Sequence, residues 1–185
     1  MTLPRLRAAG PDDAEVVALL HAHSWRRHYR GAYADSFLDG DIVPDRLSVW
    51  ASRLAAPANS TTVVAEDDTS VMGFVHVVFD DDDRWGSLVD NLHVVRDRQR
   101  TGIGTALLAC AAEAVTRQGT GRSMYLWVHE QNTAAQQFYQ ALGGTCTERT
   151  KVSAPGGMPA RLNGSPNKLR ITWSDAASLT AAAGR

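Results

Sequence analysis

The alternation of hydrophobic and polar positions divides this chain into short strands and helices. Strands are predicted where β-branched and apolar residues form short runs, at residues 3–8, 61–66, 71–79, 85–95, 123–128, 145–152 and 169–173. Helices are predicted where apolar residues recur with helical spacing, at residues 11–30, 34–39, 45–55, 103–117 and 132–142. Hairpins come first and a β-α-β unit follows, which predicts a mixed sheet with helices on both faces, in an α/β or α+β layered domain.

Local signals also predict where two of the helices begin and which side of the first one is buried. A proline and two aspartates at residues 11–13 favour the first turn of the first helix. Its buried face is predicted to be formed by Val16, Leu19, Leu20 and His23. The third helix is expected to begin just after Pro44.

Composition limits the class of protein. The chain has 185 residues, of which 44% are hydrophobic and 21% charged, enough for one domain with a sizeable core. We expect that domain at residues 1–175, followed by a polar, alanine-rich tail at 176–185. The formal net charge of −1 gives no basic field for nucleic acid. No apolar run approaches the ~20 residues of a membrane span, and no secretory segment follows Met1, so the expected location is cytoplasmic.

Metal-binding patterns are missing from the sequence. Cys110 and Cys146 have no metal-ligand spacing, and Cys110 is predicted to be a buried free thiol because it lies on an apolar helix pattern. The four aspartates at 80–83 are predicted to form a solvated turn, because the glycine and glutamate of an EF-hand loop are absent. We therefore expect no bound metal.

A glycine-containing loop joins the strand at 85–95 to the helix at 103–117. Gln99, Gly102 and Gly104 follow the spacing Q-x-x-G-x-G. The N–H groups at a helix N-terminus can bind a phosphate, and glycine lets the backbone approach the ligand closely. Arginines in the same loop could add charge-assisted hydrogen bonds. Taken alone, the segment fits a phosphate cradle or an ordinary strand-to-helix turn.

Two nucleotide-binding motifs are excluded by the same residues. A P-loop ends in Gly-Lys-Ser/Thr, whereas Gly104 is followed by Thr105 and Ala106. A dinucleotide fingerprint needs a third glycine or alanine, whereas Leu107 stands there, and the next strand has no acid at its end until Glu130.

A second informative segment follows at residues 124–144. A strand ends, Asn132 stands where a helix begins, and Tyr139 falls about two turns later, before Leu-Gly-Gly. Each residue taken alone has a structural explanation, Asn132 as an N-cap and Tyr139 as core packing.

Together the two segments resemble the GNAT superfamily of acyl-CoA N-acyltransferases. The shared elements are Leu92-x-Val94 before the loop, the Q-x-x-G-x-G spacing, and Asn132 with Tyr139 seven residues later. The resemblance extends from Leu3 to about Trp173, and its specific motifs lie at 88–144. It implies a mixed, mostly antiparallel, splayed sheet of about seven strands, with acetyl-CoA as cosubstrate in the opening and no metal cofactor. A homodimer is compatible with it.

The resemblance also implies roles for individual residues. Main-chain groups of Leu92, His93 and Val94 would pair with the pantetheine arm, and Asn132 would bond the pantetheine or its thioester end. Tyr139 would act as the general acid that protonates the departing thiolate. The pyrophosphate would be held by the backbone amides of Arg100, Thr101, Gly102, Ile103, Gly104 and Thr105.

The general base is less defined than the acid. The amine acceptor attacks the thioester directly in a ternary complex and must lose a proton, and Asp90 is the preferred base. Asp90 lies two residues before Leu92, so regular pairing predicts the same strand face, with His93 on the other face as the alternative base. A structural hydrogen bond is the competing explanation for Asp90.

The acceptor is the open part of the prediction. Family members that acetylate a protein N-terminus typically carry glutamate five residues before the asparagine, where this chain has Trp127, which favours a small amine. His21, Ser24, Trp25, His28, Tyr29 and Tyr33 cluster near the end of the first helix. Trp25 and Tyr29 are candidates for an amine-binding wall, although core packing would also explain them, and the histidines could lie at the surface. The alternatives are a protein lysine or N-terminal acetyltransferase and a non-catalytic acyl-CoA-binding or regulatory module.

Overall fold

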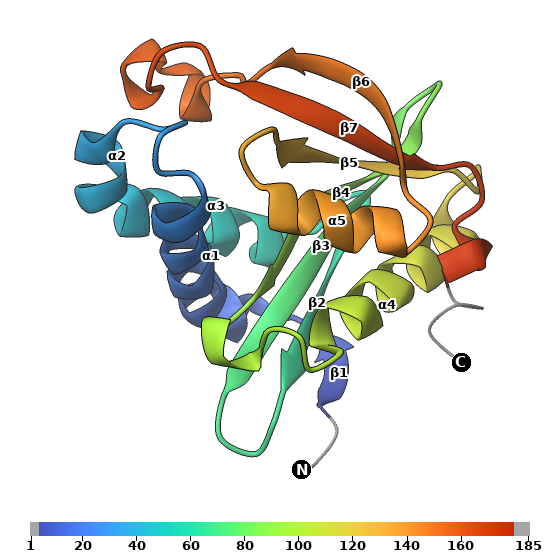
Figure 1. Cartoon of the computed structure of the whole chain (residues 1–185). Coiled ribbons are helices and arrows are strands. Elements are labelled where there is room, and N and C mark those ends of the chain that lie inside the picture. The colour runs from blue at the N-terminus through green and yellow to red at the C-terminus, as the bar shows by residue number, and fades with distance from the viewer. Residues whose placement is uncertain (1–3, 180–185) are drawn as a thin grey trace.

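The computed structural model describes residues 4–179 and contains one seven-stranded sheet in the order β1-β2-β3-β4-β5-β7-β6 (Figure 1). Every neighbouring pair is antiparallel except β4 and β5, which are parallel. The predicted mixed, mostly antiparallel sheet is therefore confirmed. The strands are β1 (Arg5–Ala8), β2 (Ser60–Glu66), β3 (Val71–Asp82), β4 (Gly86–Val94), β5 (Met124–His129), β6 (Thr145–Lys151) and β7 (Asn167–Trp173).

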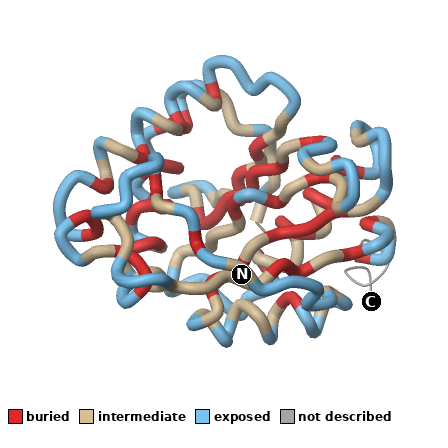
Figure 2. Tube along the Cα trace, turned by 90° about the horizontal axis from the view of Figure 1, so that it is seen from above, coloured by how far each residue is buried: buried red, intermediate tan, exposed pale blue. Residues whose placement is uncertain are grey.

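Helices cover both faces of this sheet. They are α1 (Ala14–His28), α2 (Asp35–Asp39), α3 (Ile42–Ala55), α4 (Ile103–Gln118) and α5 (Thr133–Ala141). Phe74 of β3 packs with α1 and α3, whereas the next residue, Val75, packs with α4. Figure 2 shows the buried positions gathered along the sheet and the inner sides of the helices. Alternate side chains of the central strands thus pack into two separate hydrophobic cores, one on each face of the sheet.

The sheet opens between its two parallel strands. Among the described residues, β4 and β5 pair only at Ser87 with Met124 and at Leu88 with Tyr125. Beyond Leu88, β4 continues to pair with β3 up to Val94, while β5 continues along β7 up to His129. The remaining backbone of β4 that faces β5 has no strand partner, so the two halves of the sheet diverge from a short hinge.

Two sequence predictions need correction here. Of the four residues predicted for the buried face of α1, Leu20 is buried and Val16 is half-buried, whereas Leu19 and His23 are exposed. The other buried residues of α1 are Ala14, Val17, Ala18, His21, Ala22 and Trp25. Small alanines on that face let α1 approach its neighbours closely, which a search for large apolar side chains misses. The third helix begins at Ile42 and includes Pro44 in its first turn, where a missing N–H costs nothing.

The residues just after β7 and the aspartates at 80–82 also have defined contacts. Ala176 and Leu179 are buried in the core, so these two positions of the expected tail pack with the domain, and residues 180–185 lie outside the described part. Three of the four aspartates predicted as a turn are the last residues of β3, where Asp80 accepts from the Thr120 N–H and Asp82 from the Arg84 N–H at the start of the turn. Cys110 is half-buried rather than fully buried. None of the described helices is long and apolar enough to span a membrane.

The hinge between β4 and β5 gives a stability prediction. Gly86 has φ of +81°, and a Cβ there would lie 2.2 Å from the Ser123 carbonyl oxygen. Gly86→Ala should therefore lower the free energy of unfolding by at least about 2 kcal/mol, measured by denaturant titration. Gly121→Ala is the matched control, because a Cβ at Gly121 meets nothing within 4 Å. Equal stability of the two variants would contradict a close approach at the hinge.

Candidate active site

The loop after β4 forms the helix N-terminus predicted to bind a phosphate. Gly102 is the N-cap residue of α4 with φ of +89°, and Arg100 is also left-handed with φ of +61°. The first residue of α4 whose N–H bonds back is Ala106, to the Gly102 carbonyl. The amides of the first turn therefore point out of the helix with partial positive charge.

The loop is next to the open edge of β4 and to α5. A Cβ on Gly104 would lie 3.4 Å from the Phe138 ring, so α5 lies beside the start of α4. The Gln99 side-chain amide donates to the Val94 carbonyl at 3.3 Å, which ties the loop to the end of β4. The edge of β4 at residues 92–94, which has no strand partner on the β5 side, therefore leads directly into the loop and first turn at residues 100–105. This arrangement suits an extended ligand with an anionic end.

Asn132 and Tyr139 lie on α5, which follows directly from the end of β5. The Asn132 side-chain oxygen accepts from the Ala135 N–H at 3.2 Å, so this residue is an N-cap as its structural explanation predicted. Tyr139 is buried and packs near Phe138 and Trp173, but its hydroxyl makes no hydrogen bond within residues 4–179. Burial, with a smaller effect of Tyr29, raises the pKa of Tyr139, so its hydroxyl keeps its proton at neutral pH.

A β-bulge in β4 changes the predicted placement of Asp90. His76 pairs with Asn91 and Val77 with Val89, which leaves Asp90 as an extra residue between them. The Asp90 carboxylate lies 2.8 Å from Arg53 of α3, whereas Leu92 packs into the core beside α4. Asp90 and Leu92 therefore do not share a face, and the expectation from regular alternation is wrong.

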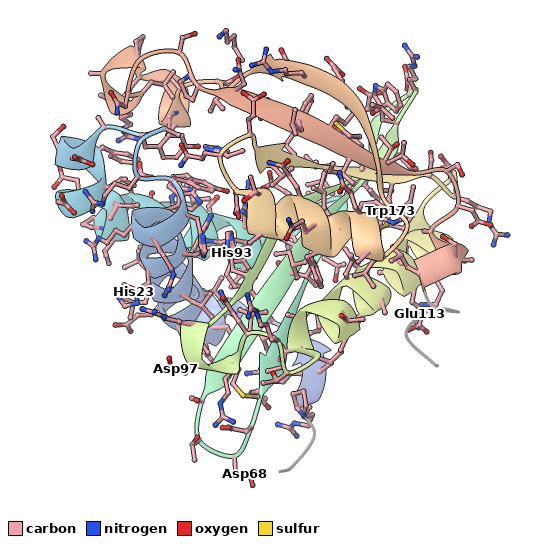
Figure 3. The ribbon with its side chains drawn as sticks, viewed as in Figure 1. His23, Asp68, His93, Asp97, Glu113 and Trp173 are labelled. Atoms are coloured by element: carbon pink, nitrogen blue, oxygen red, sulfur yellow. The ribbon has the colours of Figure 1, made fainter. Side chains whose placement is uncertain are left out.

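His93 faces the same helical layer as Asp90. Its Nδ1 lies 2.7 Å from the Ser24 hydroxyl of α1, and Figure 3 shows the side chain in the interior beside that helix. Burial lowers the pKa of His93 to about 3, so the ring is neutral at physiological pH. The prediction that His93 and Asp90 lie on opposite faces is therefore also wrong.

The α1–α3 layer holds further buried polar groups against this part of β4. His21 accepts from the Trp50 indole N–H at 2.9 Å, and its other nitrogen lies 3.3 Å from the Asn91 amide. Burial lowers the pKa of His21 well below its ordinary value. His21 is thus a core residue rather than a surface residue, and it supports the strand next to the bulge.

Aromatic side chains form a cluster beside the gap in the sheet, in which Trp25 and Tyr33 are buried core residues and Tyr29 is partly exposed. Trp25, Tyr29 and Tyr33 lie with ring centres 5.1–5.4 Å apart. Tyr29 is half-buried and stacks on His129 of β5 at 4.0 Å, across the gap from β4. Burial and the charge of Asp90 raise the pKa of Tyr29 to about 12. A cavity of about 320 Å³ lies beyond His129, between the turn at 31–32 and the loop at 163–167.

Comparisons with known proteins agree with this geometry. Residues 18–144 match the model of the acetyltransferase (GNAT) family. The curated protein YuaI of Bacillus subtilis (strain 168), described as an uncharacterized N-acetyltransferase, is 30% identical over 138 residues, which are 74% of this chain and 77% of YuaI. The chain belongs to the GNAT acetyltransferase family.

Solved structures confirm the fold of this GNAT acetyltransferase. The PaiA N-acetyltransferase of Thermoplasma acidophilum, solved with coenzyme A, superposes with a TM-score of 0.71 at 19% identity and covers 94% of this chain and 100% of its own. YncA of Salmonella typhimurium, solved with acetyl-CoA, has a TM-score of 0.66 at 20% identity and covers 94% of both chains.

Sequence reasoning missed three residues of this site in the GNAT acetyltransferase. Arg53 pairs with Asp90, His129 stacks on Tyr29, and Lys168 lies opposite His129 on β7. Arg53 and His129 carry no local signal, because their roles depend on which strands and helices become neighbours. Lys168 has a weak signal, since the chain has only two lysines.

The αL conformation of Gly102 gives a prediction for the loop. Gly102→Val should weaken acetyl-CoA binding by about tenfold or more, measured by calorimetry, because a β-branched residue resists positive φ and shifts the neighbouring amides. Gly121→Val, at a glycine without positive φ in another exposed turn, is the control. Undiminished affinity for acetyl-CoA in a folded Gly102→Val protein would show that this loop does not bind the pyrophosphate.

Proposed function

We propose that this chain transfers the acetyl group of acetyl-CoA to a primary amine of a small molecule, by direct attack in a ternary complex. The observation that carries the proposal is the gap between β4 and β5, with exposed backbone on one side and Asp90 with the aromatic residues on the other. One face can hold the thioester while the acceptor enters from the α1–α3 side. We further propose that the chain acts as a single acetyltransferase domain, whose core extends past residue 175 to Leu179.

The cosubstrate assignment is supported by the shape of the loop and by relatives. Residues 92–94 would pair with the pantetheine arm as an added strand, the amides of residues 100–105 would hold the pyrophosphate, and Asn132 would bond the pantetheine. Two structures with the same fold contain coenzyme A or acetyl-CoA. A backbone N–H of residues 92–94 would polarise the thioester carbonyl.

Asp90 is our proposed general base. A primary amine with a pKa of ~10 is only about 0.1% neutral at pH 7, which costs roughly 4 kcal/mol, so a base is needed to remove its proton. The Asp90 side chain is about one-third exposed and faces the open side of β4, where a water can reach it. The neutral His93, with its strongly lowered pKa, is the weaker candidate.

Tyr139 is our proposed general acid. The thiol of the leaving group has a pKa of ~8.5, which is below that of a tyrosine, so proton transfer from the tyrosine to the thiolate is unfavourable by itself. The transfer therefore needs a short hydrogen bond to the sulfur and must accompany cleavage of the C–S bond. The unbonded Tyr139 hydroxyl, whose pKa is raised by burial, supplies that proton at neutral pH. The proton returns to the tyrosine from solvent after coenzyme A leaves.

The presence of a tryptophan at position 127, with two cations against its ring, supports a small-molecule acceptor. The Trp127 indole faces the open side of β5 and carries the cations of Lys168 and Arg170 against its ring, at 4.3 and 4.2 Å. A protein N-terminus would meet positive charge there instead of the carboxylate that typically faces it in relatives. Trp25 and Tyr29 would form the opposite wall for the acceptor.

The role of Asp90 can be separated from its ion pair. Asp90→Asn should lower kcat/KM by about 10²-fold or more and alter the pH–rate profile, because the base is lost. Arg53→Met breaks the same ion pair but keeps the carboxylate, so it should retain most of the activity. Equal losses in both variants would mean that Asp90 serves only the ion pair.

The role of Tyr139 can be tested by removing one oxygen atom. Tyr139→Phe should lower kcat by about 10²-fold while the KM for acetyl-CoA changes little, because the ring packing stays. Tyr125→Phe is the control, since the Tyr125 hydroxyl bonds Asp81 outside the gap. The measurement is thiol release from acetyl-CoA, and a Tyr139→Phe enzyme with full kcat would exclude the acid role.

A further inference from the structure

One cation on the open side of the sheet has no anionic partner within the part of the chain that the structure describes. Lys168 of β7 is half-buried and pairs in register with His129 at the end of β5. Its ammonium lies 4.3 Å from the centre of the Trp127 ring. Within residues 4–179 it makes no hydrogen bond and no ion pair.

The other basic residues of the same hairpin are all engaged. Between Thr145 and Trp173 the sequence has five basic residues and a single acidic one, Glu148. Arg170 pairs with Glu148, Arg149 with Glu130 and Arg161 with Asp45, while the Lys151 ammonium donates to the Ser165 carbonyl. Positive charge therefore accumulates on this side of the gap, and Lys168 is the member left uncompensated.

Lys168 lies close to residues of the proposed active site. It lies opposite His129, and the His129 ring stacks on Tyr29 at 4.0 Å, so Lys168 is on the β5 side of the gap next to the aromatic cluster. Burial and the charge of Arg170 lower the pKa of Lys168, while the charges of Glu148 and Asp90 raise it. The charge of Lys168 also lowers the pKa of His129, after the larger effect of burial. A half-buried ammonium without an anion is unfavourable and would be stabilised by a bound one.

We propose that Lys168 anchors a carboxylate of the acceptor, which makes the substrate class an amino acid or another amine that carries a carboxylate. This inference rests on the proposed function. The acceptor amine would face Asp90 on β4 and its carboxylate would face Lys168 on β7, so the two halves of the splayed sheet would each bind one end of a zwitterion. The Trp127 ring lies against the Lys168 ammonium and helps to position it.

The test is a set of matched acceptors with wild-type enzyme and acetyl-CoA. Each L-amino acid is compared with its carboxamide and with the amine that lacks the carboxyl group, by thiol release. The carboxylate-bearing member of a reactive set should have kcat/KM at least about tenfold above the other two. Lys168→Met should abolish that preference mainly through KM and leave the simple amine unchanged, and Lys168→Arg should restore part of it.

Lys151→Met is the matched control, because Lys151 is the only other lysine, is exposed and lies on the same hairpin. It should keep the preference for the carboxylate. Equal rates for the three matched acceptors with wild-type enzyme, or equal slowing of all three by Lys168→Met, would overturn the inference while leaving the proposed function intact.

If no amine in the panel releases thiol although acetyl-CoA binds, the proposed function fails. The role of Lys168 is then tested by the binding of a carboxylate-bearing ligand without catalysis. The readout is then thermal unfolding of the coenzyme A complex with N-acetylated amino acids. A rise in Tm for wild type that Lys168→Met loses and Lys151→Met keeps would support the anchor. The absence of any rise in wild type would refute it.

Discussion

The short parallel contact between β4 and β5 is the constraint on which the rest of the site depends. Two residue pairs join the strands at Ser87 and Leu88, and each strand then follows a different antiparallel partner. The N-terminal half of the sheet is held by α1 and α3, while the C-terminal half ends in the β6–β7 hairpin. Because each half is stabilised by its own partners, the unpaired backbone between them persists without a strand to fill it.

The polar groups behind β4 complement this opening. A bulge turns Asp90 toward Arg53, and the residues after it are supported by histidines that burial keeps neutral. Neutral rings can accept or donate hydrogen bonds in a small volume without the cost of an unpaired buried charge. The charged carboxylate therefore remains at the edge of the gap, where water reaches it, while the layer behind it stays dry.

Much of this arrangement follows from local sequence. The glycine spacing at 99–104 and the cap at Asn132 are local signals, and the structure places them at the starts of α4 and α5. The bulge at Asp90 could not be predicted, because an extra residue in one strand depends on the register of its partner. The buried face of α1 is predictable only in part for a related reason: Leu20 is buried as expected, but the alanines are buried by close helix packing that the sequence of one helix does not reveal.

The near absence of lysine has a consequence for the chain itself. An enzyme that binds a reactive thioester exposes its own amines to acetylation, whereas a guanidinium keeps its proton and is a poor nucleophile. This sequence carries 17 arginines and two lysines, and one of the two lies on the open side of the sheet. The predominance of arginine supplies surface charge and ion pairs while leaving few side chains that self-acetylation could modify.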